Sequence, residues 1–404
     1  CELATGHGQP VERETLEMTW RTFLGAAALC CTAGIGVANA DDAGVHFNQN
    51  GLEYRSGDDN VRINLGGRLH LDTASVDTGT ATTQDSETRR ARLELSVRLY
   101  DRLRFRIDRE FTNGGGWRNV WASYDLSDEY SVKVGNFIAP FSMEDLSSSN
   151  ETTFMERSLS QALAPSFGVG VGATYGSRHF TISGAYMGDA IDAEDNIQAE
   201  KGQGVDLRGT WSPVDSREQS LHFGAGFDRR EFDAGKSRSI SSGAESNLSP
   251  TVIRTGTIAN VDTTQSVNGE IGYSIGPVLF QGQYITTDVQ RTAGADMTFS
   301  GYYAQVAWTV TGEHHGYSNS TGTFSSPEPR GRWGAVEVAA RVSSLDLSDS
   351  PVGGQADDTS VGVNWYIGHN VRLMANYVHS RVDGVTPLQD RDTDVVEGRA
   401  QLSF

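Results

Sequence analysis

The chain has 404 residues, with 33 lysines and arginines against 52 aspartates and glutamates, and a formal net charge of −19. So acidic a chain is a poor partner for nucleic acid. Its mean hydropathy is −0.41, and no stretch approaches the ~18 consecutive apolar residues of a membrane-spanning helix, which excludes a helical membrane protein.

Residues 18–40 have the layout of a cleaved secretory signal. The segment has a basic start at Arg21, a short apolar stretch, and small residues at its end, Ala38-Asn39-Ala40. We therefore expect residues 1–17 to be upstream sequence translated from a misassigned start, and residues 41–404 to form the mature domain. The alternatives are an N-terminal core helix and a lipoprotein signal at Cys30 or Cys31.

The cysteines agree with export. Cys1, Cys30 and Cys31 all precede the expected cleavage point, so the mature chain has no disulfide framework and no cysteine metal site. Removal of residues 1–40 takes away four acids and two bases, which leaves 48 acids (52 − 4), 31 bases (33 − 2) and a net charge of −17.

The mature chain then alternates polar and apolar residues in many successive segments. Residues 61–72, 90–100 and 103–108 each set an apolar face against a face rich in arginine. The first two reach the ~9–11 residues that a tilted strand needs to cross a bilayer. Further alternating segments bring the expected number of strands to sixteen: 118–126, 130–138, 169–176, 179–188, 204–212, 221–232, 265–275, 278–290, 298–310, 333–346, 359–367, 371–381 and 393–404.

The connections between these strands fall into two classes. Short ones such as Asp101-Arg102 and Gly276-Pro277 count onto one end, which we expect to be periplasmic. Connection 311–332 is long but counts onto the same end. The other long connections are expected to be external loops: 73–89, 139–168, 189–203, 233–264, 347–358 and 382–392.

The last ten residues alternate strictly and end on the aromatic Phe404. In a membrane barrel the last strand must pair with the first, because an open sheet edge is not tolerated in lipid. The sequence therefore predicts an all-β fold, a closed 16-stranded antiparallel transmembrane β-barrel. We expect Ala91, Leu93, Leu95, Leu402 and Phe404 to face lipid or a neighbouring subunit, and Arg90, Arg92, Arg104 and Arg106 to face water. The alternative is a secreted β-sandwich that binds carbohydrate.

Several motifs occur in order between residues 61 and 404. They are Arg89-Arg90-Ala91-Arg92-Leu93, Val134-Gly135-Asn136-Phe137-Ile138-Ala139-Pro140-Phe141, Ser147-Ser148-Ser149 with Phe154-Met155-Glu156-Arg157, Gly301-Tyr302-Tyr303-Ala304-Gln305, and Val361-Gly362-Val363-Asn364-Trp365-Tyr366. Together they resemble the phosphate-selective porin O and P family, which are trimeric sixteen-stranded outer-membrane channels.

The resemblance implies that loop 139–168 folds inward as the constriction, that 233–264 and 311–332 also enter the lumen, and that arginines form a ladder guiding anions. It implies that Arg157 is the constriction arginine and that Ser148 and Ser149 are its hydroxyl pair. Asp145 and Asn150 stand where the phosphate-specific members carry lysines, which opposes phosphate. The implied ladder comprises Arg89, Arg90, Arg92, Arg104 and Arg106.

Guanidinium groups and hydroxyls can replace the water around a phosphate with charge-assisted hydrogen bonds. Other roles for these residues stay open. Arg157 can pair with Glu151 or Glu156, the serines can cap a loop helix, and the ladder can be neutralised by acids such as Glu94 and Asp108.

We therefore expect an outer-membrane diffusion channel for small anions such as phosphate or polyphosphate, surrounded by lipid and assembled as a homotrimer. No catalytic residue, cofactor or metal site is expected, since the histidines are scattered and no catalytic or nucleotide-binding motif occurs. The alternatives are a general or weakly cation-selective porin and an outer-membrane barrel hydrolase.

Overall fold

The computed structural model describes residues 43–112, 115–191, 202–384 and 392–404. The expected signal peptide, the segment before it and the three cysteines lie outside these residues. Within the described ranges, no helix is both long and apolar enough to cross a membrane.

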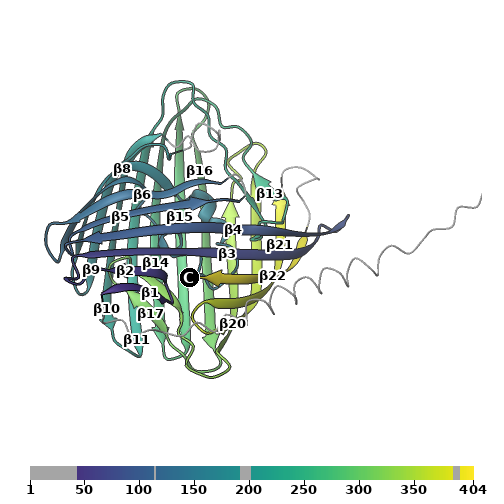
Figure 1. The fold of residues 1–404 in the computed structure, drawn as a ribbon. Coiled ribbons are helices and arrows are strands. Elements are labelled where there is room, and N and C mark those ends of the chain that lie inside the picture. Colours follow the sequence, from purple (N-terminus) through teal and green to yellow (C-terminus); the bar gives the residue numbers. More distant parts are fainter. Residues whose placement is uncertain (1–42, 113–114, 192–201, 385–391) are drawn as a thin grey trace, which may run out of the picture. The chain divides into compact units, whose positions relative to one another are not determined.

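In the described ranges the main sheet has 18 strands, of which the first two form a hairpin that precedes the barrel. The other sixteen (18 − 2) pair in sequence order and are all antiparallel (Figure 1). The last strand pairs with the first along Asp394↔Asp77 to Ser403↔Arg68, which closes the barrel and confirms the predicted fold class. The sixteen strands are β3 (Val61–Asp77), β4 (Thr82–Leu99), β5 (Leu103–Glu110), β6 (Gly116–Asp125), β7 (Tyr130–Ile138), β8 (Phe167–Gly176), β9 (Phe180–Met187), β10 (Gln203–Asp215), β11 (Gln219–Glu231), β14 (Val261–Ile275), β15 (Val278–Arg291), β16 (Met297–Thr309), β19 (Ala335–Asp346), β20 (Gly354–Ile367), β21 (Val371–Gly384) and β22 (Thr393–Ser403).

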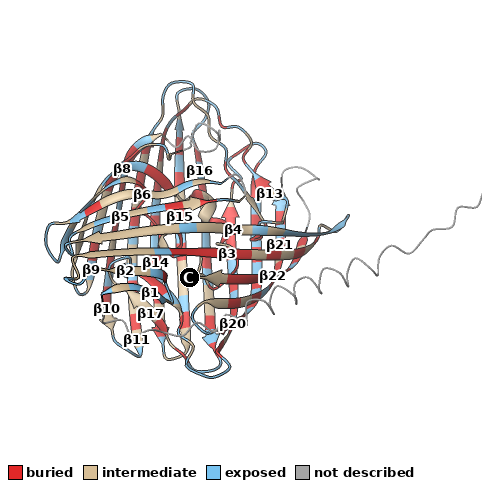
Figure 2. Ribbon diagram, viewed as in Figure 1, coloured by how far each residue is buried: buried red, intermediate tan, exposed pale blue. Residues whose placement is uncertain are grey.

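The barrel is apolar outside and polar inside. Figure 2 shows the alternation of burial along the strands. On β20 the apolar Val361, Val363 and Trp365 are exposed, whereas Ser360 and Asn364 are buried. This inversion is expected where the outer surface meets lipid and the interior holds polar groups. On β4 the predicted phase is confirmed, because Leu93 is 46% exposed and Arg90 is 8% exposed.

Residues 73–89 are not a loop, which corrects the expectation from the sequence. β3 and β4 stay paired as far as Asp77↔Thr82, so that only residues 78–81 turn at the tip of a long hairpin. The segment does not alternate apolar and polar residues, which is why the sequence did not predict a strand here. It is rich in threonine and serine, and threonine suits a strand. β20 and β21 likewise extend into the expected loops 347–358 and 382–392.

A hairpin of β1 (Gly44–Asn48) and β2 (Gly51–Arg55), which the sequence reading missed, precedes the barrel. β2 pairs with β3 from Leu52↔Leu65 to Arg55↔Arg62, next to the point where β22 ends. The exposed edge of β3 is therefore covered by two different partners, which removes an unpaired strand edge.

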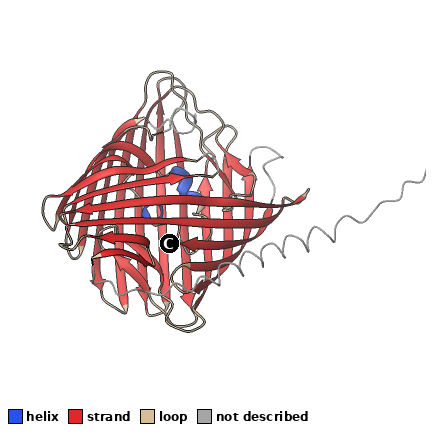
Figure 3. Cartoon of the chain, viewed as in Figure 1, coloured by secondary structure: helices blue, strands red, loops and turns tan. Residues whose placement is uncertain are grey.

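Three segments fold into the barrel, as the family resemblance implied. Residues 139–166 hold the short helix α2 (Met143–Leu146) and the 3₁₀-helix η1 (Leu159–Leu163), both drawn in blue in Figure 3. η1 packs through Leu159 and Leu163 on side chains of β15, β16 and β19. The other two segments carry the hairpins β12 (Ser241–Gly243) with β13 (Thr251–Arg254) and β17 (His315–Ser318) with β18 (Thr323–Pro327).

Candidate functional site

The constriction loop, residues 139–166, crosses the lumen and bonds to the opposite wall. The amide of Met143 donates to Glu270 on β14 (2.7 Å), and the backbone oxygen of Thr153 accepts from Asn364 on β20 (2.9 Å). Arg372 on β21 donates to the backbone oxygen of Thr152 (2.8 Å). Because partners on three strands hold this loop, it is a fixed partition across the pore.

Arg157 forms hydrogen bonds with the first turn of this loop. Its guanidinium donates to the backbone oxygens of Glu144 (2.9 Å), Asp145 (3.1 Å) and Ser147 (3.0 Å), at the carboxyl end of α2. Carbonyl groups at a helix end carry partial negative charge and favour a cation. Arg157 does not pair with Glu151 or Glu156 within the described chain, so no carboxylate cancels its charge by direct contact.

Glu156 is the acid at which several arginines converge. Its carboxylate accepts from Arg89 (2.9 Å) and Arg399 (2.7 Å), and Arg90 lies 3.6 Å away. Burial alone would raise its pKa, but the charges of Arg90, Arg89 and Arg399 outweigh burial and hold the pKa of Glu156 well below its usual range. The adjacent Arg89 and Arg90 can both reach it because the β3–β4 register shifts between His70 and Leu71, as at a β-bulge.

The tip of the loop lies against β3. Arg68 donates to the hydroxyls of Ser149 (2.8 Å) and Ser148 (3.3 Å), and the Asn150 side chain bonds His70 (3.1 Å). The two serines therefore cap no helix through their side chains; α2 is capped by Ser142 instead. The hydroxyls keep their donor hydrogens for another partner, since they accept from Arg68.

Asp145 is packed within the loop. It is 4% exposed, and it does not line either of the two cavities described below. Its Oδ2 has no hydrogen-bond partner in the described structure. Asp145, which the sequence suggested as an obstacle to anions, therefore lies behind the residues that line these cavities.

The predicted arginine ladder follows the wall of β4 and β5, and each of its members meets a carboxylate. Arg92 pairs with Glu110 (3.2 Å), and Arg106 pairs with both Glu94 (2.6 Å) and Asp108 (2.8 Å). Arg104 bonds Asp125 on β6, and Arg89 and Arg90 meet Glu156. The ladder exists as a row of ion pairs, which is the open alternative considered from the sequence.

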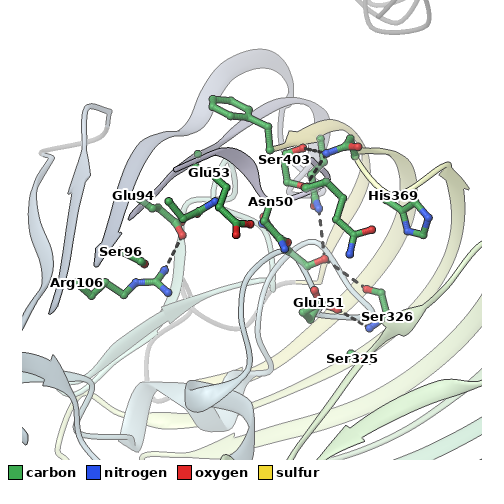
Figure 4. A pocket seen from close by; sticks show the side chains of 18 of the residues that line it. Asn50, Glu53, Glu94, Ser96, Arg106, Glu151, Ser325, Ser326, His369 and Ser403 are labelled. Carbon is green, nitrogen blue, oxygen red and sulfur yellow. Dashed lines mark hydrogen bonds and ion pairs between the residues drawn. The ribbon is translucent and has the colours of Figure 1, made fainter. Parts of the chain in front are cut away.

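Two of the cavities among the described residues lie along the passage. The cavity among the long loops, of about 460 Å³, is lined by five arginines and three glutamates: Arg89, Arg90, Arg92, Arg118, Arg157, Glu110, Glu156 and Glu245. The cavity toward the short turns has about 730 Å³ and is lined by parts of the β1–β2 hairpin, the loop tip and segment 310–334. Figure 4 shows this second cavity, with Glu94 and Arg106 on one side and Glu151 bonded to Ser326 on the other. Lining rich in arginine on both sides suits a path for anions.

Several interior charges escaped the sequence reading. Glu270 joins Arg208 (2.5 Å), His222 (3.2 Å) and the constriction loop, and Arg208 holds the backbone oxygen of Thr321 (2.6 Å). Glu245, from the inward segment 232–260, pairs with Arg341 (2.5 Å) on β19. An ionisable residue on the polar face of a strand could have indicated such a group. The sequence does not indicate, however, which inward segment that residue contacts.

Comparison with known proteins agrees with this geometry. Residues 63–404 match the sequence model of the family described as phosphate-selective porin O and P. The chain belongs to this family, and it is an outer-membrane porin. It is 26% identical to Porin O of Pseudomonas aeruginosa (strain PAO1), over 94% of this chain and 97% of that protein.

The fold is also found among solved outer-membrane proteins. The anion-selective porin from Comamonas acidovorans has a TM-score of 0.56 and 15% identity, with 85% of this chain and 100% of that chain covered. The trimer form of OmpT from Vibrio cholerae has a TM-score of 0.56 and 11% identity, with 86% of this chain and 100% of that chain covered. These likenesses concern the barrel fold.

Proposed function

We propose that the mature domain, residues 41–404, is a homotrimeric outer-membrane channel through which small anions diffuse, and that it has no enzymatic activity. The observation that carries the proposal is the setting of Arg157. Its guanidinium stands on the constriction loop, is bound by backbone carbonyls, and lines a cavity where arginines outnumber glutamates five to three.

The local charge, and not the charge of the whole chain, should set the selectivity. The net charge of −17 is spread over external loops, turns and ion pairs, and exposed charges are screened beyond a Debye length of roughly 8 Å at physiological salt. The comparisons with known proteins support the same direction, since one solved neighbour is called an anion-selective porin and the matching family is described as phosphate-selective.

Phosphate itself should bind weakly in the constriction. Asp145 contributes a negative charge behind the lining that repels phosphate, and Ser148 and Ser149, held by Arg68, offer only the hydrogens of neutral hydroxyls. We therefore expect Arg157 with Ser148 and Ser149 to pass phosphate, or polyphosphate, without holding it tightly, and Asn150 to fix the tip of the loop against His70.

The test is reconstitution in a planar bilayer across a KCl gradient, followed by added phosphate. The expected result is a reversal potential of the anion-selective sign and weak or undetectable block of chloride current by phosphate. Arg157→Ala should lower the chloride-to-potassium permeability ratio by roughly threefold to tenfold, the effect of removing a unit charge about 7 Å from a permeating ion in water.

Asp145→Lys should strengthen the phosphate block, and Asp128→Lys, which makes the same change of charge on an exposed turn, should not. A reversal potential of the cation-selective sign would favour the alternative of a weakly cation-selective porin. Tight block of the unmodified channel by phosphate would contradict the weak binding proposed for the constriction.

A further inference from the structure

Arg118, on the wall of β6, differs from the other cavity arginines in how its charge is met. Arg89 and Arg90 meet Glu156, and Arg92 meets Glu110. Arg118 instead lies over the ring of Phe167, with its guanidinium carbon 4.4 Å from the ring centre. Within the described residues it makes no ion pair, and its Nε has no hydrogen-bond partner.

A shift in strand register turns this side chain into the lumen. Trp121 and Ser123 on β6 face the lumen opposite Arg106 and Arg104, so strict alternation would place Arg118 outside. The β5–β6 register shifts between Ile107 and Arg109, and Trp117 then lies outside against Arg109. A bulge of this kind re-aims a side chain, and it brings Arg118 into the cavity beside Arg157.

The surroundings of Arg118 leave its charge available. The ring of Phe167 holds the guanidinium by a cation–π contact, which fixes its plane without neutralising it. Asp145 and Glu110 attract it electrostatically and Arg92 and Arg157 repel it, but among the described residues it makes no ion pair or side-chain hydrogen bond with any of the four. A planar cation fixed on an aromatic face keeps its free N–H groups for an oxoanion.

The balance of charge around the constriction follows from these contacts. Arg118 and Arg157 contribute two positive charges that no carboxylate of the described residues contacts, and the packed Asp145 contributes one negative charge from behind the lining. The sum is +1, whereas without Arg118 it would be zero. The anion preference of this passage would then depend on arginines that each already meet a carboxylate.

We propose that Arg118 is a specificity-determining residue of the channel, which pairs with Arg157 to bind a small oxoanion and offsets the charge of Asp145. This inference rests on the proposed function, because it assigns a residue to the same anion path. Arg118 and Arg157 line the same cavity from different elements, the barrel wall and the constriction loop.

The experiment compares Arg118→Gln, Arg118→Lys and Arg109→Gln in the full-length channel in planar bilayers, at a salt concentration near 0.1 M, where charges act over about 10 Å. Arg109 is the matched control, because it belongs to the same hairpin and also lies over an aromatic ring, that of Trp117 (4.8 Å), but on the outer face. Folding of each variant is checked by heat-modifiable migration on a gel.

Arg118→Gln should lower the chloride-to-potassium permeability ratio by roughly threefold to tenfold. Arg118→Lys should keep most of the ratio, and Arg109→Gln should not change it. If the unmodified channel is anion-selective and Arg118→Gln behaves like Arg109→Gln, the role of Arg118 is overturned and the proposed function stands. If the unmodified channel is cation-selective, both the role of Arg118 and the proposed function are overturned. If Arg118→Gln does not fold, the permeability ratios of Arg118→Lys and Arg118→Met are compared instead, and equal ratios overturn the role of Arg118.

Discussion

The carboxylate of Glu156 gives a prediction whose sign is opposite to that of most changes at the constriction. Glu156 and Asp72 carry two negative charges among Arg89, Arg90 and Arg399, so that this cluster has a net charge of +1 (3 − 2). Glu156→Gln keeps the shape of the side chain and raises the sum to +2. The variant should therefore be more selective for anions than the unmodified channel.

The expected size follows from Coulomb's law. A unit charge about 7 Å from an ion in water changes the energy of that ion by roughly 0.6 kcal/mol. The added positive charge attracts the anion and repels the cation, so the chloride-to-potassium permeability ratio should rise by up to about sevenfold. The same change weakens the anchoring of the loop. Removal of one partner of a buried ion pair costs about 3–5 kcal/mol, and the lower value applies because glutamine still accepts hydrogen bonds.

A loss of about 3 kcal/mol raises the population of the detached loop by about a hundredfold. Single-channel recordings at about 0.1 M KCl should therefore show both a larger reversal potential and more current fluctuations. Glu231→Gln removes the same charge from a side chain that is 70% exposed, and it serves as the control. The reasoning would be refuted if Glu156→Gln gave the reversal potential and the quiet current of Glu231→Gln.

Two further predictions concern the anchors of the inward segments. Glu270→Ala should destabilise the barrel by about 3–5 kcal/mol, because it leaves the buried Arg208 without its carboxylate and frees Met143 of the constriction loop. The temperature at which the folded band is lost on a gel should therefore fall. If it does not fall relative to that of Glu231→Ala, the anchoring role of Glu270 is contradicted. The second concerns pH: the folded pKa of Glu156 is depressed, so the stability that its ionised form provides is fully present above the unfolded pKa of about 4.3 and is lost only as the pH falls through the lower folded value. The reversal potential should then stay constant from pH 7 to pH 5 as far as Glu156 is concerned, and a change that is absent in Glu156→Gln would contradict this assignment.

The sequence by itself determined the barrel and the orientation of its strands. Alternation with a period of two is a local property, and lipid makes the same demand on every strand, so residues such as Val361 and Val363 face outward wherever the strand lies. The sequence also indicated that the last strand ends on Phe404, which bonds Gly67 through its backbone (2.7 Å and 3.0 Å). The family motifs placed Arg157 on an inward loop, and its contacts there agree with that placement.

Only the tertiary structure decided which charges remain free. Arg399 and Asp72, which form one of the buried pairs, are 327 residues apart in the sequence. The positions of Arg89 beside Arg90 and of Arg118 depend on register shifts between strands, which strict alternation cannot reveal. The selectivity of a pore depends on such pairings. The sequence looks the same for an arginine that contacts a carboxylate and for an arginine that is held by carbonyls or a ring. The first has no local net charge, whereas the second keeps its positive charge.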